Sequence, residues 1–310
     1  MSVEWVVAIL ATAVTAGTPL LYASLGEILA ERVGVLNLGV EGMMLVGAVA
    51  GFAVALKTGS PWLGVLAATA TGGAMALIHA FLTVSLRANQ VASGLALTLF
   101  GTGLSAYLGK PLVGNPLPCA FKAVDIPVLG DIPVLGPIIF RHDPLVFLSY
   151  LLVLGLWFLI YRTRAGLNLR AVGENPGAAD AMGVNVFALR YFYVVVGGML
   201  AGIGGAYISM AYVPTWIENL VAGRGWIAVA LVIFAMWNPV YALVGAYIFG
   251  GVDALGFRLQ ALHVGVSPYF LKMLPYFFTV AVLILVTRKN ALSRIGAPQA
   301  LGLPYDREER

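Results

Sequence analysis

Charged residues and cysteines are scarce in this sequence. Asp, Glu, Lys and Arg make up 10% of its 310 residues, against about a quarter in a soluble domain. Cys119 is the one cysteine, which excludes an internal disulfide and a multi-cysteine metal site. The net charge of +4 comes without a basic stripe, so we expect no nucleic-acid partner.

Several motifs of enzymes are also missing. The sequence contains no G-x-x-x-x-G-K-[ST], which argues against an ATP site of the P-loop type. It contains no H-E-x-x-H, and His79, His142 and His263 are far apart, so we expect no metal. A G-x-S-x-G elbow is absent as well, which disfavours a hydrolase. We therefore expect no catalytic residues and no cofactor.

Long apolar runs fill the rest of the chain. Hydrophobic residues make up 60% of it and the mean hydropathy is +0.92, so many segments reach the roughly 20 apolar residues that a membrane helix needs. The N-terminus lacks the basic start of a cleaved signal and is interpreted as a first span. The predicted spans are about 3–25, 35–56, 62–85, 90–108, 144–161, 188–212, 225–237, 239–256 and 269–287. The fold class is an all-α polytopic membrane protein with about eight to ten transmembrane helices.

Basic residues between the runs predict the orientation in the membrane. Arg162, Arg164, Arg170 and Arg190 surround segment 162–187, and Arg288, Lys289 and Arg294 follow the last span. Both regions should be cytoplasmic. An even number of spans must then separate them, so 225–237 and 239–256 are two spans. We predict a permease domain over 1–287, with 162–187 inside the cell, the N-terminus and the Pro-rich loop 109–143 outside, and a cytoplasmic tail over 288–310.

The segment "GEILAERVGVLNLGVEGMM" (26–44) places polar groups beside apolar ones. Glu27, Glu31 and Arg32 fit an inner surface. Asn37 and Glu41 lie four residues apart and share one helical face. Glycines nearby weaken a regular helix, which favours a broken segment whose backbone lines a cavity. The alternative is that Glu41 pairs with a basic group and braces the bundle.

Amide and hydroxyl side chains recur at the ends of other spans. They suit hydrogen bonds with an uncharged polar solute. Trp226 and Trp237 are interpreted as anchors at the membrane surface rather than as stacking platforms. The candidate residues of a substrate pathway are Asn37, Glu41, Asn89, Gln90, Ser93 and Asn238.

Small residues recur every four positions in two of the predicted spans. Gly47 and Gly51 make one such pair. Two more stripes are Gly197, Ala201 and Gly205, and Gly198, Gly202 and Ala206. Such stripes let helices approach closely in lipid, so we predict packing contacts there.

The stretch "LRAVGENPGAADAMGVN" (169–185) is polar, small and well capped. Asn175 is a good N-cap, Pro176 suits the first helical position and Gly183 suits the position after the end. The predicted helix, 176–182, is too short to be stable alone and must pack against something. It is either a connector resting on its own bundle or a peg that enters a groove of a soluble partner. The candidate contact residues are Glu174, Asn175, Pro176, Ala179, Asp180 and Met182.

This stretch resembles the coupling loop of permeases in ABC importers for branched-chain amino acids, simple sugars and nucleosides. Segments 31–48 and 223–251 support the resemblance, and "LNLGVEGMM" is most similar to the nucleoside-uptake branch. Many relatives place a basic residue after the Asn-Pro, where this chain has Gly177. That departure leaves the exact partner contacts open.

The resemblance implies a permease subunit of a bacterial plasma-membrane importer that moves a nucleoside, with a purine type favoured. Two permease chains, often different, would form the pathway in the lipid bilayer. An ATP-binding subunit would bind below them, and an extracytoplasmic substrate-binding protein would deliver solute from above. The alternatives are a permease for simple sugars or branched-chain amino acids, an ion-coupled secondary transporter working through Glu41, and a membrane enzyme with a lipid-like substrate.

Overall fold

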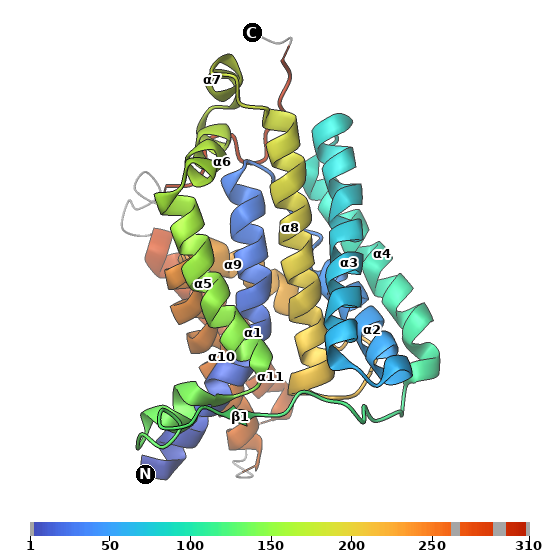
Figure 1. Cartoon of the computed structure of the whole chain (residues 1–310), viewed down its shortest axis with the longest axis vertical. Coiled ribbons are helices and arrows are strands. Elements are labelled where there is room, and N and C mark those ends of the chain that lie inside the picture. The colour runs from blue at the N-terminus through green and yellow to red at the C-terminus, as the bar shows by residue number, and fades with distance from the viewer. Residues whose placement is uncertain (1–2, 262–266, 288–295, 308–310) are drawn as a thin grey trace.

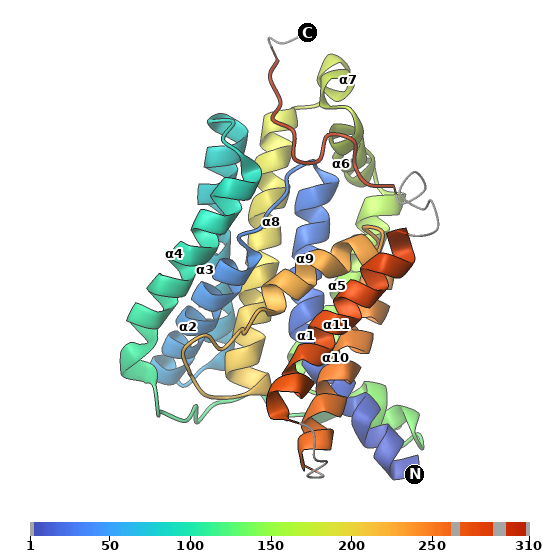
Figure 2. The same cartoon turned by 180° about the vertical axis from the view of Figure 1, so that it is seen from behind.

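The chain folds into a bundle of α-helices (Figures 1 and 2). The computed structural model describes residues 3–261, 267–287 and 296–307. The helices in these residues are α1 Val3–Arg32, α2 Val40–Thr58, α3 Pro61–Ala80, α4 Gln90–Gly109, α5 Pro144–Arg162, α6 Arg164–Glu174, α7 Pro176–Ala181, α8 Val186–Tyr207, α9 Arg224–Phe234, α10 Pro239–Ala261 and α11 Pro268–Thr287.

Short turns and strands complete the fold. Three π-helical turns are η1 Phe81–Ser85, η3 Gly136–Phe140 and η4 Ile208–Tyr212, and η2 Lys110–Leu112 is a 3₁₀ turn. Strands β1 Val124–Asp125 and β2 Arg141–His142 pair antiparallel within the long loop between α4 and α5. Arg141 holds that loop through ion pairs with Asp125 at 3.1 Å and Asp131 at 3.3 Å.

The two ends of the bundle differ in what they carry. The short helices α6 and α7 and the C-terminal segment lie at one end, and the N-terminus and β1 lie at the other (Figure 1). Segment 162–187 and the described tail thus lie at the same end of the bundle, and the side of the membrane that this end faces stays a prediction. α9 and α10 are separate helices, since α9 ends at Phe234 and α10 begins at Pro239. With 11 residues α9 is short for a complete span, so the predicted pair of spans stays a prediction. Arg288, Lys289, Arg294 and His263 lie outside the described residues.

Seven of the described helices are long and apolar enough to cross a membrane. α9 is apolar but shorter, with 11 residues, and α11 packs against α10. The prediction of an all-α polytopic membrane protein is confirmed, and the protein is a multi-pass protein of the cell membrane.

Two predicted boundaries were wrong at the N-terminal end of the chain. The first span does not stop near residue 25, because α1 continues to Arg32. Glu27 and Glu31 are therefore not on an inner surface but are buried, with 1% and 2% of their surfaces exposed. The second helix begins at Val40 rather than at 35, so residues 33–39 form a non-helical segment.

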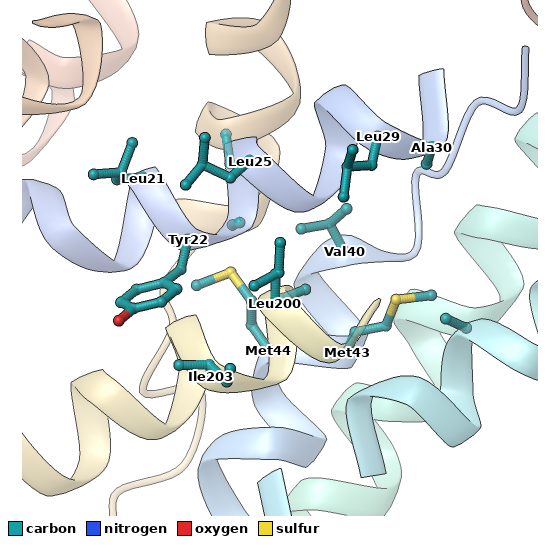
Figure 3. Packing of buried hydrophobic residues seen from close by; sticks show 14 of the residues in the cluster. Leu21, Tyr22, Leu25, Leu29, Ala30, Val40, Met43, Met44, Leu200 and Ile203 are labelled. Carbon is teal, nitrogen blue, oxygen red and sulfur yellow. The ribbon is translucent and has the colours of Figure 1, made fainter. Parts of the chain in front are cut away.

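The core lies where α1, α2 and α8 meet, and Figure 3 shows Leu25, Met44 and Leu200 packed there. Lipid tails are as apolar as these side chains, so close packing rather than exclusion from water must hold the helices together. Glycines permit that approach: a Cβ on Gly26 would overlap the backbone of Gly197, and one on Gly47 would overlap Gly202. The packing role predicted for the small-residue stripes is confirmed.

Candidate functional site

Segment 33–39 joins α1 to α2 inside the bundle and is made of turns and irregular backbone. Backbone groups inside a membrane protein need partners when no helix supplies them. The Leu36 N–H donates to Gln90 Oε1 at 2.7 Å, and the Asn37 N–H donates to Glu27 Oε1 at 2.9 Å. Thr98 Oγ1 donates to the Leu38 carbonyl at 2.9 Å. Side chains of α1 and α4 thus replace the missing helical hydrogen bonds.

His79 of α3 holds the same segment from a third side. Its Nε2 lies 3.0 Å from the Leu36 carbonyl oxygen, and its Nδ1 lies 3.0 Å from Ser93 Oγ. His79 is buried, and both of its ring nitrogens lie within hydrogen-bond distance of protein oxygen atoms. Asn37 belongs to this segment, Gln90 binds it directly, and Ser93 contacts it through His79.

Glu41 joins two helix starts inside the bundle. It lies in the first turn of α2, and its carboxylate accepts hydrogen bonds from the N–H groups of Gly223 at 2.8 Å and Gly225 at 2.6 Å. These two groups belong to the start of α9, where a carboxylate is favoured by the free N–H groups and the helix dipole. A Cβ on Gly225 would overlap the backbone of Glu41. The hydrogen-bond donors to Glu41 thus belong to a helix N-terminus and not to the basic side chain that the bracing alternative named.

The junction between α9 and α10 contacts the inner end of α1. Trp237 Nε1 donates to Glu31 Oε2 at 2.5 Å, and Arg32 Nε donates to the Trp237 carbonyl at 3.3 Å. Trp237 is 3% exposed, so the prediction of a membrane-surface anchor was wrong for this residue. The reason is that its indole N–H satisfies a buried carboxylate.

Asn89 and Asn238 do not join the residues around segment 33–39. Asn89 is exposed and caps α4 by accepting from the Ala92 N–H at 2.9 Å. Asn238 accepts from the Val240 N–H at 2.9 Å at the start of α10. Capping accounts for both amides.

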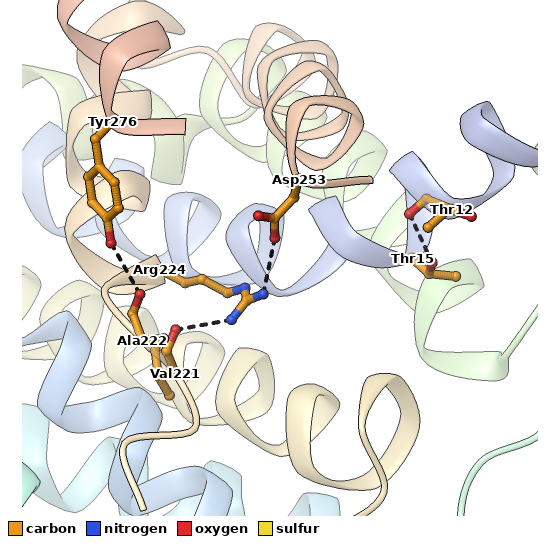
Figure 4. Close-up of polar contacts among 7 residues, drawn as sticks. All are labelled: Thr12, Thr15, Val221, Ala222, Arg224, Asp253 and Tyr276. Carbon is orange, nitrogen blue, oxygen red and sulfur yellow. Dashed lines mark hydrogen bonds and ion pairs between the residues drawn. The ribbon is translucent and has the colours of Figure 1, made fainter. Parts of the chain in front are cut away.

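Sequence reasoning missed a second polar cluster, which Figure 4 shows. Arg224 Nη2 pairs with Asp253 Oδ2 at 3.1 Å, and the Tyr276 hydroxyl donates to the Ala222 carbonyl at 3.2 Å. These side chains, with Tyr212 and Phe249, line a cavity of about 470 Å³. The available signal was Asp253 within the predicted span 239–256 and Arg224 directly before the span 225–237. Charges at such positions are costly in lipid and usually face a partner or a cavity.

The predicted peg is the helix α7, whose caps are as expected. Asn175 Oδ1 accepts from the Ala178 N–H at 2.9 Å, Pro176 takes the first position, and Gly183 has a φ of 84°. Glu174, Asn175 and Met182 are exposed, and Met182 is 84% exposed. Ala179 instead faces the chain itself and is 5% exposed, and Asp180 binds Arg307. The outward face of α7 therefore consists of Gly177, Ala178, Ala181 and Met182.

Comparisons with known proteins show which membrane proteins this chain is similar to. The sequence profile of the permease component of the branched-chain amino acid transport system matches residues 9–287. A putative glucose ABC transporter permease of Haloferax volcanii is 44% identical over 95% of this chain and 96% of its own length. A guanosine ABC transporter permease of Bacillus subtilis is 35% identical over 94% of each chain. A nucleoside ABC transporter permease of Lactococcus lactis is 35% identical over 93% of each chain. No solved structure matches the chain.

Proposed function

Because this chain belongs to the family of branched-chain amino acid transport permease components, as an ABC permease of the sugar and nucleoside type, we propose that it conducts a nucleoside into the cell. The observation that carries this choice is the full-length similarity to two nucleoside permeases from different bacteria. A purine nucleoside is the favoured solute, since one of the two relatives is a guanosine permease.

A simple sugar is the second candidate. The 44% identity to a putative glucose permease favours it. Both solutes share a neutral ring that carries hydroxyl groups, and such a ring is bound by amides, carboxylates and hydroxyls. Asn37, Gln90 and Ser93 are proposed to line or shape the pathway, because they gather at a non-helical segment inside the bundle. Glu41 is proposed to shape it too, because it joins α2 to the start of α9. Gln90 also has a buried Nε2 without a hydrogen bond to the protein in the described part of the chain.

Energy for transport is proposed to come from outside this chain. The family implies an ATP-binding subunit and a substrate-binding protein. The outward face of α7 is small and exposed at the end of the bundle (Figure 1), which suits a peg in a groove of the ATP-binding subunit. Closure of that subunit on ATP would move α7 and change which side of the bundle is open. A second, different permease chain is proposed to complete the pathway.

The solute is tested most directly on the substrate-binding protein that works with this permease. Titration calorimetry with guanosine, adenosine, glucose and leucine compares the candidates on one sample. Our proposal predicts tight binding of a purine nucleoside and none of leucine. Tight binding of glucose without binding of guanosine would replace the nucleoside by the second candidate.

A further inference from the structure

The C-terminal segment 296–307, here called the strap, runs along the end of the bundle that carries α6 and α7 (Figure 2). Its backbone accepts or donates hydrogen bonds at Gly296, Ala300 and Leu303. Arg32 Nη1 donates to the Gly296 carbonyl at 3.4 Å, and the Ala300 N–H donates to the Gly173 carbonyl at 2.9 Å. Arg190, a buried residue of α8, donates to the Leu303 carbonyl at 3.3 Å. The strap is thereby attached to α1, α6 and α8.

Three consecutive residues at the end of the strap contact three different elements. Tyr305 is 9% exposed, and its ring lies 5.6 Å from that of Phe187 at the start of α8. Asp306 pairs with Arg87, which precedes α4. Arg307 binds the coupling helix α7 by two bonds to Asp180, from Nε at 2.8 Å and from Nη2 at 2.5 Å. Such a two-pronged pair fixes orientation as well as distance.

The contact between Asp306 and Arg87 connects the strap to residues that bind the buried segment 33–39. Arg87 lies in loop 86–89, between η1 and α4, and its φ of 55° is uncommon for a residue with a side chain. Gln90 follows directly and holds the Leu36 N–H at 2.7 Å. A continuous series of bonded groups therefore runs from α7 through the strap and loop 86–89 to segment 33–39. A displacement of α7 can reach segment 33–39 along this series only if α7, the strap and loop 86–89 move together.

We propose that the strap is a positioning element that ties the coupling helix α7 to loop 86–89, so that movement of α7 reaches α4 and segment 33–39. This inference rests on the proposed docking of an ATP-binding subunit on α7. Asp180, Asp306 and Arg307 are its positioning residues. Without the strap, α7 would keep its exposed face and its partner, but its movement would be transmitted only through α6 and α8.

The test uses the complete importer in lipid nanodiscs and compares Asp306→Ala with wild type. Spin labels at Ala88→Cys and Val184→Cys, in a Cys119→Ser background, report the distance between loop 86–89 and the end of α7, and neither position is on the outward face of α7. In the wild type we expect the same narrow distance distribution without nucleotide and with ATP and vanadate. In Asp306→Ala we expect the distribution to broaden or to shift with nucleotide. An unchanged distribution in Asp306→Ala would overturn the proposal.

The amount of solute taken up per ATP hydrolysed is a second readout. It would not change if the strap only stabilised the fold. In proteoliposomes, guanosine and glucose taken up per ATP hydrolysed should fall about fivefold or more in Asp306→Ala and in Asp180→Arg, at unchanged binding of the ATP-binding subunit. Asp180→Arg combined with Arg307→Asp should restore the ratio. Lys57→Ala, which removes an exposed charge at the opposite end, is the control. Equal ratios in all variants, or no rescue by the double variant, would contradict the strap.

The two proposals can be told apart. If the ATP-binding subunit fails to bind the wild-type permease, the docking proposal is wrong, and the strap loses its role with it. If the subunit binds and drives uptake equally well in wild type and Asp306→Ala, only the strap is wrong.

Discussion

Replacing Glu41 by Ala should release the start of α9 from α2. The change removes an acceptor of two hydrogen bonds, from Gly223 at 2.8 Å and Gly225 at 2.6 Å, inside the bundle. A hydrogen bond to a charged group contributes about 1.5 kcal/mol or more, so the local opening free energy should fall by about 3 kcal/mol. Since about 1.4 kcal/mol is a factor of ten, amide exchange over residues 219–226 should accelerate about 100-fold.

The assay is hydrogen–deuterium exchange with mass spectrometry on the permease in detergent. Glu41→Gln keeps one acceptor oxygen and should give an intermediate acceleration of about tenfold. Glu218→Gln changes an exposed carboxyl in the loop before α9 and is the matched control. Exchange at the wild-type rate in Glu41→Ala would refute the reasoning, because the two bonds would then contribute nothing to the junction of α2 and α9.

Three further pairs of variants test the faces of α7 and the packing of the bundle. Ala178→Arg, on the exposed face of α7, should abolish uptake and binding of the ATP-binding subunit at an unchanged unfolding midpoint, whereas Ala179→Arg, at a buried position, should also lower that midpoint; equal midpoints for both would contradict the assigned faces. Trp237→Phe should cost about 1–3 kcal/mol of unfolding free energy, because Glu31 loses a buried donor, and Trp226→Phe, with its 37% exposed ring, should cost much less. Gly197→Val should give aggregated protein in size-exclusion chromatography, since any Cβ there overlaps the backbone of Gly26, and Gly103→Ala, with open space around it, should stay monodisperse; the same elution profile for both would argue against close helix contact.

Much of the architecture was predictable because lipid imposes simple rules. A helix must satisfy its backbone groups by itself, so long apolar runs indicate where most of the membrane helices lie. The caps of α7 were predictable for a similar reason, since Asn175, Pro176 and Gly183 act within a few residues of chain. These features are local and do not depend on which helices become neighbours.

The interior was less predictable because its contacts join residues far apart in the sequence. Nothing near Trp237 indicates that it meets Glu31, 206 positions earlier. The N–H groups that bind Glu41 belong to a glycine-rich stretch more than 180 residues away. Ala179 is buried because of where α7 lies relative to α8 and the strap, and this too depends on residues distant in the sequence.

Uptake by reconstituted permeases with and without the ATP-binding subunit tests the central claim most directly. Proteoliposomes that contain this chain, its second permease and the loaded substrate-binding protein are given ATP or an ion gradient, and entry of labelled guanosine and glucose is measured. We predict uptake only when the ATP-binding subunit and ATP are both present, and none when α7 carries Ala178→Arg. Solute accumulation by the permeases alone, driven by a proton or sodium gradient, would contradict the account.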